Sequence, residues 1–175
     1  MLYKTYYNSP VGKLLLVSKD NQLIGLWLEN QKYYLANIKE KLTLKDNIPI
    51  FIQTKKWLND YFNGQKKDIK ELQLNPQGTP FSKLVWHYLT LIPYGTTTTY
   101  KEIANQVKKK LQKENMSSQA IGNAISHNPI SIIIPCHRVI GTNNNLTGYA
   151  GGIANKIELL KIEGIDTTKL HYKGD

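Results

Sequence analysis

LYKTYYNSPVGKLLLVSKDNQLIGLWLE, residues 2–29, contains three strand-like stretches separated by two turn signals. The turns are SPVG at residues 9–12 and DN at residues 20–21, both rich in residues that favour tight reversals. The strand-like stretches lie at residues 2–8, 13–18 and 22–29. Strands joined by such short turns pair antiparallel, so the sequence predicts a β-meander at the beginning of the fold.

After residue 29, the strand-like pattern ends. A segment of mixed polarity runs to about residue 47, and residues 50–62 follow with apolar side chains at helical spacing. This predicted helix stops at Asn63-Gly64. Residues 66–74 are expected to be extended, and NPQG at residues 75–78 is the best candidate for a domain boundary.

After this boundary the pattern is mostly helical. Three helices are expected, and the last two are preceded by hydroxyl residues that can cap their first turns. They are residues 81–91 after Thr79-Pro80, residues 100–110 after Thr98 or Thr99, and residues 118–127 after Ser117 or Ser118. The last two, joined by a lysine-rich link, are typical of a helix-turn-helix, although many such pairs only pack together.

Small residues gather on the last of these helices. Ala120 and Ala124 lie one turn apart with Gly122 between them, and a glycine inside a helix costs about 1 kcal/mol relative to alanine. A close approach to another surface would account for this. That surface is either a neighbouring helix or a nucleic-acid groove.

Composition narrows the class of protein. The 175 residues carry 23 Lys and Arg against 13 Asp and Glu, a formal charge of +10 that favours a polyanionic partner such as nucleic acid. No apolar run is long enough to span a membrane, and the polar, aromatic first ten residues are not typical of a signal peptide. A single cysteine excludes an internal disulfide and, with four scattered histidines, argues against a structural zinc site, so a reducing, cytoplasmic setting is expected.

That cysteine lies in IIIPCHRVIG, residues 132–141. The apolar residues 130–134 are expected to form a buried strand that Pro135 ends, which would place Cys136 on a turn. His137 and Arg138, the one arginine of the chain, follow directly. A neighbouring base or cation lowers the pKa of a thiol, so Cys136 is either a buried inert side chain or an activated nucleophile.

Several motifs around the cysteine carry a family resemblance. PCHRVI follows Asn128-Pro129 and precedes TGYAGG at residues 147–152, and the match extends through SPVGKLLLVS near the start and GTPFSKLVWHYLTLIPYGTTTTYKEIA in the middle. The chain resembles the methylated-DNA–protein-cysteine methyltransferases, the O6-alkylguanine-DNA alkyltransferases. The resemblance implies an α+β fold. Residues 1–78 would form a small ribonuclease H-like α/β domain with an antiparallel sheet, and residues 79–175 a mostly helical, catalytic domain with a winged helix-turn-helix.

The resemblance also implies an activity. Cys136 would take the alkyl group from O6-methylguanine, and from O4-methylthymine as a further candidate, once per molecule and without a cofactor or metal. The partner would be double-stranded DNA, bound through its minor groove by a monomer, with the damaged nucleotide flipped out of the stack. The preference among alkyl groups stays open.

Site residues follow position by position from the family. Glu163 would orient His137, which would act on Cys136 through a water. Tyr100 would help rotate the nucleotide, and Asn128 would tie the recognition helix to the cysteine segment. The implied pocket residues are the Val139 carbonyl, Tyr149, Ala150, Gly151 and Gln119.

The recognition helix differs from well-known members at one position. The implied DNA contacts are Thr99, Ser118, Gln119, Ala120, Gly122 and Asn123. Where the family often has an arginine that fills the gap left by the flipped base, this chain has Gln119, which brings no charge. The zinc-binding N-terminal domain of another member has no counterpart, because residues 1–78 contain neither Cys nor His.

Two further readings compete with alkyl transfer. Alkyltransferase-like proteins recognise lesions without repairing them, but in those relatives the cysteine is replaced, which favours the enzyme here. A helix-turn-helix regulator with an inert thiol leaves PCHRVI and the glycine-rich residues 148–152 unexplained.

Overall fold

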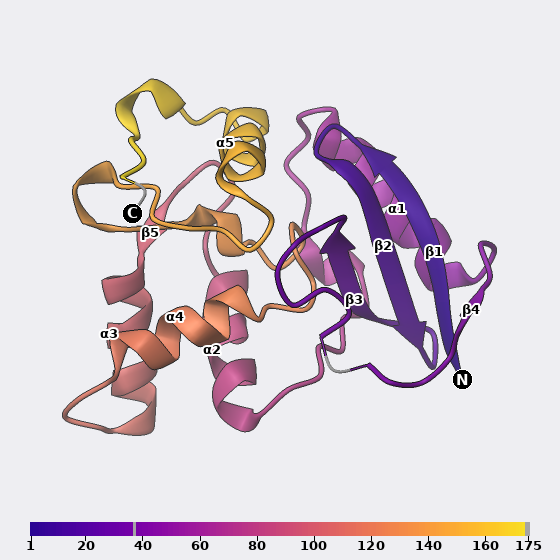
Figure 1. Cartoon of the computed structure of the whole chain (residues 1–175), viewed down its shortest axis with the longest axis horizontal. Coiled ribbons are helices and arrows are strands. Elements are labelled where there is room, and N and C mark those ends of the chain that lie inside the picture. Colours follow the sequence, from indigo (N-terminus) through magenta and orange to yellow (C-terminus); the bar gives the residue numbers. More distant parts are fainter. Residues whose placement is uncertain (37, 174–175) are drawn as a thin grey trace.

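The N-terminal part of the chain is built around a small sheet. The computed structural model describes residues 1–36 and 38–173. The meander is confirmed, and its antiparallel strands are β1 (Leu2–Ser9), β2 (Gly12–Lys19) and β3 (Gln22–Leu28) (Figure 1). Gly12, Asp20 and Asn21 have positive φ, as the two tight turns require.

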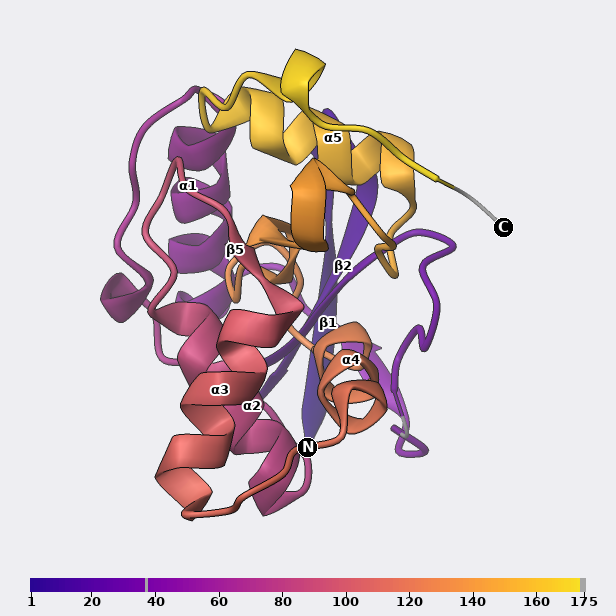
Figure 2. The ribbon, with the colours of Figure 1, turned by 90° about the vertical axis from the view of Figure 1, so that its left-hand side faces the viewer.

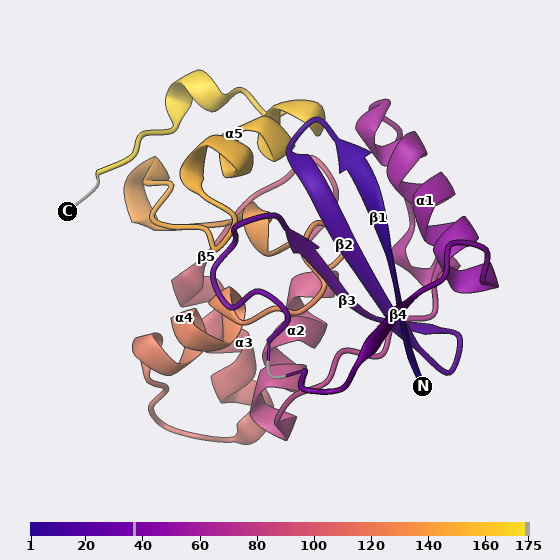
Figure 3. The ribbon, with the colours of Figure 1, turned by 45° about the vertical axis from the view of Figure 1, so that its right-hand side comes forward.

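A fourth strand extends the sheet at the edge away from β3. β4 (Leu42–Leu44) pairs parallel with β1, giving the order β3-β2-β1-β4 (Figure 3). It was not predicted, because three residues are too few to show an alternating pattern. The extended structure expected for residues 66–74 is largely wrong: residues 69–71 form a 3₁₀ helix, and only Leu74 pairs, in a single bridge with Leu23.

One face of the sheet is covered by α1 (Pro49–Phe62), the helix expected there. It buries an apolar stripe against the strands and ends at Asn63, followed by Gly64 with φ of 83°. The stripe includes Phe51, Trp57 and Leu58, and it ends with Tyr61 at the far end of the helix. This last position matters, because it brings an aromatic side chain of the N-terminal part towards the second half of the molecule.

The second half is mostly helical, as predicted. The two expected caps are present, because the side chains of Thr99 and Ser117 accept a backbone N–H in the first turn of the helix that follows, and Thr79 caps the first helix in the same way. The helices are α2 (Pro80–Thr90), α3 (Tyr100–Leu111), α4 (Ser118–Ser126) and α5 (Ile153–Ile162) (Figure 2). Two short strands, β5 (Thr98–Thr99) and β6 (Val139–Ile140), pair parallel between them.

The strand predicted over residues 130–134 is wrong. Ile130 makes one bridge to Leu26, and residues 131–134 form a turn in which Ile132 has φ of 72°. A 3₁₀ helix, η2 (Cys136–Arg138), follows Pro135. The isoleucines are buried on every side, and an apolar run without periodicity does not distinguish a buried strand from a buried turn.

The two halves share one hydrophobic core. Side chains of β2, β3 and α1 pack in the same cluster as side chains of α2, α3, α4 and the Cys136 segment. Backbone bonds reinforce the contact, since Leu26 N–H donates to the Pro129 carbonyl (2.8 Å) and Ser131 N–H donates to the Leu26 carbonyl (3.0 Å). The edge strand β3 thus supports the segment that leads to the cysteine. The α+β fold class is confirmed, and in the described ranges no helix is both long and apolar enough to cross a bilayer.

Candidate active site

A cavity of about 430 Å³ opens beside Cys136. Its walls come from the loop after β3, from α3 and α4, and from the loop before α5. The lining residues are Lys32, Tyr33, Tyr100, Ser118, Gly122, Ile125, Ser126, Cys136, Thr147, Gly148, Tyr149 and Ala150. A pocket of this volume with mostly apolar walls can hold a flat, base-sized ligand.

The Cys136 side chain is only 5% exposed. Burial raises the pKa of the thiol above its usual range, and the Asn128 amide and the Lys156 charge act in the opposite direction. Arg138 is not the cation that the sequence placed beside the sulfur. Its guanidinium donates to Glu163 Oε1 (2.7 Å) and to the Ile92 carbonyl (2.7 Å) instead.

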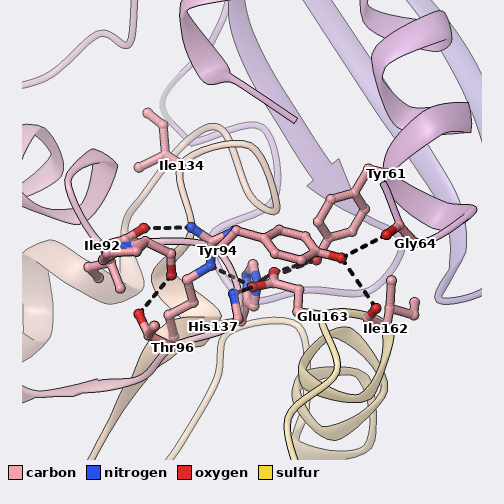
Figure 4. A network of polar contacts seen from close by, with 12 residues as sticks. Tyr61, Gly64, Ile92, Tyr94, Thr96, Ile134, His137, Ile162 and Glu163 are labelled. Atoms are coloured by element: carbon pink, nitrogen blue, oxygen red, sulfur yellow. Dashed lines mark hydrogen bonds and ion pairs between the residues drawn. The ribbon is translucent and has the colours of Figure 1, made fainter. Parts of the chain in front are cut away.

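His137 and Glu163 form a buried pair (Figure 4). His137 Nε2 lies 2.5 Å from Glu163 Oε2, while Nδ1 has no hydrogen-bond partner within residues 1–36 and 38–173. Burial lowers the pKa of His137, and Glu163 opposes this. For Glu163, burial raises the pKa, but the hydrogen bonds from His137 and Arg138 and the charge of Arg138 outweigh it and lower the pKa to about 2.

Cys136 and His137 are adjacent but do not lie in extended backbone. Both belong to the 3₁₀ helix η2, so their side chains do not alternate as they would in a strand. His137 is not among the residues that line the cavity, and its imidazole is hydrogen-bonded to Glu163 at the end of α5. The pair comes from residues 26 positions apart in the sequence.

Asn128 lies where the helix-turn-helix meets the cysteine segment. Its side-chain amide donates to the Ile134 carbonyl (2.8 Å), and its side-chain oxygen accepts from Ile130 N–H (3.0 Å). Both ends of the side chain are therefore used to close the turn before Pro135. Asn128 therefore shapes the turn before Pro129 and also ties the end of α4 to the cysteine segment.

Three aromatic or small residues expected at the pocket are found there. Tyr100 begins α3 and lines the cavity, and burial raises its pKa to about 12. Tyr149 is next to Ala150 in the opposite wall, and its buried hydroxyl has no hydrogen-bond partner in the described part of the chain. Gly151 does not line the cavity, but a side chain there would collide with the Tyr149 ring, so its role is to let that ring pack.

The Val139 carbonyl is not at the cavity. Val139 is fully buried in β6, and its oxygen accepts from Lys156 Nζ (2.7 Å). The same ammonium group donates to the carbonyls of Leu146 (2.7 Å) and Gly148 (2.9 Å). Lys156 is fully buried, and burial lowers its pKa to about 8.

The residues expected on the recognition helix divide between two surfaces. Ser118 and Gly122 line the cavity, and a Cβ at Gly122 would meet no atom within 4 Å. Gln119 and Asn123 are exposed and Ala120 is half-buried. Ala124 is buried in the core, so the small residues do not share one face, and no part of the described chain approaches Gly122 closely.

Thr99 lies apart from the cavity and caps α3 through a bond from Glu102 N–H (3.1 Å). It lines a second hollow between α3 and the link to α4, together with Ser118 and the lysines Lys101 and Lys108. Glu114 also lines this hollow, so the helix-turn-helix has a depression next to the cavity whose charged residues are two lysines and one glutamate.

Several functional candidates were not predicted. Lys156 and Tyr61 are buried at the site, and Lys32 and Tyr33 reach the cavity from the N-terminal half, where the Tyr33 ring stacks on His127 at 3.6 Å between centroids. In the sequence, Lys156 is one lysine of a lysine-rich chain, and Tyr61 is one apolar position of an amphipathic helix. Neither carries a local signal, because both depend on contacts distant in sequence. Within residues 1–36 and 38–173, no cluster of three or more His, Cys, Asp or Glu side chains is arranged to hold a metal ion.

Comparison with known proteins gives matches over nearly the whole chain. The family model described as 6-O-methylguanine DNA methyltransferase, ribonuclease-like domain, matches residues 2–76. The model described as 6-O-methylguanine DNA methyltransferase, DNA binding domain, matches residues 80–165.

Individual proteins agree with these matches. The methylated-DNA–protein-cysteine methyltransferase of Haemophilus influenzae is 37% identical over 94% of this chain and 87% of its own length. That of Methanosarcina acetivorans is 40% identical over 93% of this chain and 99% of its own. A crystal structure of Mycobacterium tuberculosis OGT in complex with DNA superposes with a TM-score of 0.80 at 36% identity, covering 96% of this chain and 94% of that one.

Proposed function

The chain belongs to the family of methylated-DNA–protein-cysteine methyltransferases, and on this premise we propose that it repairs DNA by taking the alkyl group of O6-methylguanine onto Cys136. DNA binding, methyl transfer and DNA repair follow from the family. One observation supports Cys136 as the acceptor of the alkyl group: this one cysteine of the chain lies in the wall of a base-sized cavity, next to a buried histidine–glutamate pair.

The reaction is one displacement. The Cys136 sulfur attacks the methyl carbon, the sulfur–carbon bond forms as the carbon–oxygen bond to guanine O6 breaks, and the thiol proton ends on the guanine that leaves. A thioether has no ready way back to a thiol, so each molecule reacts once. The reaction needs neither a cofactor nor a metal.

His137 is the group that moves the thiol proton. Its Nε2 is taken by Glu163, so Nδ1 is the nitrogen available to act on Cys136, through a water. The low pKa of His137 keeps the imidazole neutral and able to accept a proton at neutral pH. Because burial raises the pKa of the thiol, the positive charge of Lys156 supports the thiolate once the proton has left.

The DNA would be bound through its minor groove by α4. Gly122 and Ser118 leave room at the cavity mouth, while Gln119, Ala120 and Asn123 contact the duplex and Thr99 orders the start of α3. The reacting carbon is out of reach inside a duplex, so the nucleotide is flipped into the cavity, between Tyr100 and the Tyr149–Ala150 wall. Asn128 ties the turn that precedes Cys136 to the end of α4.

The remaining assignments concern the whole chain. Division into a ribonuclease H-like domain of residues 1–78 and a DNA-binding domain of residues 79–175 is supported by the separate ranges of the two family models. A protein that reacts once through a free thiol suits a reducing compartment such as the cytoplasm. The cysteine and all the walls of the cavity beside it come from one chain, which suits action as a monomer.

The test is a stoichiometric repair assay. Duplex DNA with one O6-methylguanine, in tenfold excess over protein, should gain unmodified guanine up to about one equivalent of protein and then stop. Cys136→Ser should bind the same DNA and restore no guanine. Repair that continues past one equivalent would contradict single turnover, and wild-type binding without repair would favour the lesion-recognition alternative.

A further inference from the structure

Glu163 is held by four donors, two on each carboxylate oxygen. Oε1 accepts from Arg138 Nε (2.7 Å) and from Gly95 N–H (3.2 Å). Oε2 accepts from His137 Nε2 (2.5 Å) and from the hydroxyl of Tyr61 (2.6 Å). Three of these donors come from the C-terminal half, whereas Tyr61 belongs to α1 of the N-terminal half.

The tyrosine hydroxyl lies inside the histidine–glutamate pair. It is 3.4 Å from His137 Nε2 and shares Oε2 with that nitrogen (Figure 4). Tyr61, like His137, is fully buried, so water does not compete with these bonds. Burial and then Glu163 raise the pKa of Tyr61, which keeps its hydroxyl protonated and restricts it to the role of a donor towards the carboxylate.

Packing alone does not explain a tyrosine at this position. Its ring stacks on Trp57 (5.6 Å between centroids) and meets Tyr94 edge-on (6.3 Å), contacts that a phenylalanine would also make. The hydroxyl adds a polar group to a buried aromatic cluster. Such a group is costly unless it is hydrogen-bonded, and its partner here is the one carboxylate that contacts His137.

A donor on Oε2 changes the basicity of His137. The hydroxyl stabilises the Glu163 carboxylate and withdraws part of its charge from the imidazole, so a proton on His137 is stabilised less. The charged groups that face the imidazole act together with this bond: Arg138 and Lys156 lower its pKa as burial does, and Glu163 opposes them. Tyr149 and the Cys136 thiol complete the titratable groups around the site.

We propose that Tyr61 is a positioning residue of the proton relay, contributed by the N-terminal half, which holds Glu163 and keeps His137 neutral so that the imidazole can accept the thiol proton. The inference rests on the proposed function, in which neutral His137 is the base. It also assigns the N-terminal half a task in the chemistry beyond supporting the fold, since α1 supplies a hydrogen bond to the relay.

The test compares Tyr61→Phe with the wild type, because this change removes only the hydroxyl. His137 is titrated by NMR in histidine-labelled protein without DNA, and the rate of methyl uptake is followed against pH. The titration of His137 should move to higher pH by about half a unit to one unit, and the acid limb of the rate profile should move with it. At a pH below both midpoints, the variant should react about three- to tenfold more slowly.

Tyr94→Phe is the matched control. The Tyr94 hydroxyl contacts the carbonyls of Gly64 (3.3 Å) and Ile162 (3.4 Å) but not the carboxylate, so its removal should leave the titration of His137 in place. A second variant carries 3-fluorotyrosine at position 61, whose more acidic hydroxyl is a stronger donor. It replaces one ring hydrogen with fluorine and keeps the hydroxyl, and it should move the His137 titration to lower pH.

The outcomes separate the possible roles of the hydroxyl. An unchanged His137 titration in Tyr61→Phe and in the fluorinated protein, with or without a uniform loss of rate, would overturn the inference and leave Tyr61 a packing residue. If the wild type takes up no methyl group, the proposed function is contradicted. The titration of His137 needs no DNA, so it still shows whether the Tyr61 hydroxyl sets the pKa of His137.

Discussion

At the residue scale, the site depends on charges that are buried together. Glu163, His137 and Lys156 are each nearly or fully inaccessible, and Arg138 is 9% exposed. Each charge has a partner: the carboxylate has the Arg138 guanidinium and a hydrogen bond from neutral His137, and the ammonium group has three carbonyls. Removing one partner leaves the other buried without compensation, so these residues should control stability as well as chemistry.

Glu163→Gln should therefore lose stability in a pH-dependent way. The pKa of Glu163 is lowered from 4.5 to about 2 in the folded protein. A carboxylate with a depressed pKa stabilises the fold above its unfolded pKa, and this contribution disappears as pH falls through the folded value. The shift corresponds to about 3 kcal/mol at neutral pH.

Urea unfolding at pH 7, 4.5 and 3 measures this effect. The free-energy difference between wild type and Glu163→Gln should be largest at pH 7 and should shrink below pH 4.5. Glu114→Gln, at an exposed residue of the α3–α4 link, is the control and should differ little from wild type at any of these pH values. A deficit for Glu163→Gln that stays constant with pH would show that the carboxylate charge is not the stabilising group.

The sequence predicted some residues of this cluster and not others. Cys136, His137 and Glu163 were named because the PCHRVI motif and its flanks resemble a known family, and the fold brings His137 onto Glu163. Tyr61 and Lys156 were not named, because their roles come from partners that the fold brings from other segments. A buried lysine bonded only to carbonyls has no pattern in the sequence around it.

At the element scale, α4 is the part of the molecule that meets DNA in the proposed function. Its cap Ser117 fixes its beginning and Asn128 ties its end to the turn before the thiol. Gly122 lies between these points with open space above it. Both ends of α4 are therefore fixed by hydrogen bonds, and the middle of the helix stays accessible.

Gln119→Arg should tighten DNA binding. Gln119 is exposed near the start of α4, and an arginine there adds a charge and a planar group that can stack in the space left by a flipped base. The dissociation constant for duplex DNA with O6-methylguanine should fall by about three- to tenfold, a typical range for one added charge-assisted contact. Fluorescence anisotropy with labelled duplex measures this constant.

Gln53→Arg is the control for added charge. It places the same residue on the exposed face of α1, which lies against the sheet away from α4 (Figure 1). Equal tightening by both variants would mean that net charge alone is responsible. No change in affinity or repair rate for Gln119→Arg would contradict the role assigned to position 119.

Elements were predictable where a local pattern determined them. The meander, α1 and the capped helices α2, α3 and α4 agree with turn signals, apolar periodicity and hydroxyl caps. The strand predicted before the cysteine was wrong, because residues 130–134 are enclosed by the core on all sides and show no alternation of apolar and polar side chains. Their turn depends on Asn128 and on the bridge from Leu26, which are tertiary contacts.

At the scale of the whole molecule, the excess of positive charge should make the affinity for DNA depend on salt concentration. The formal charge is +10, and Lys101, Lys108 and Lys32 lie in the hollows on either side of Ser118. Cations that neutralise phosphates release bound counterions, so affinity should fall with salt. A plot of log affinity against log salt should be linear, with a slope of about −0.9 for each phosphate contacted.

Two lysine variants localise this effect. Lys101→Gln should reduce the slope by about one unit if Lys101 contacts a phosphate, whereas Lys66→Gln, exposed beyond the end of α1, should leave it unchanged. An affinity that does not depend on salt would contradict an electrostatic DNA interface. Equal effects of the two variants would mean that the interface is not centred on α3 and α4.

The whole molecule also explains why the two halves were predicted separately but act together. Turn and helix patterns divide the chain near residue 78, yet one core and the Leu26 bridge join the parts. Contacts between halves, such as Tyr61 with Glu163 and Tyr33 with His127, arise only when the chain is folded. The sequence indicates the parts, and the fold determines what each contributes to the site.

In the proposed reaction, Cys136 is the acceptor of the alkyl group. Intact-protein mass spectrometry after mixing with O6-methylguanine DNA, followed by peptide mapping, shows whether the alkyl group reaches this residue. We expect a gain of one methyl group per chain, located on the peptide that contains Cys136 and absent in Cys136→Ser. An unchanged mass, or a methyl group on any other residue, would contradict it.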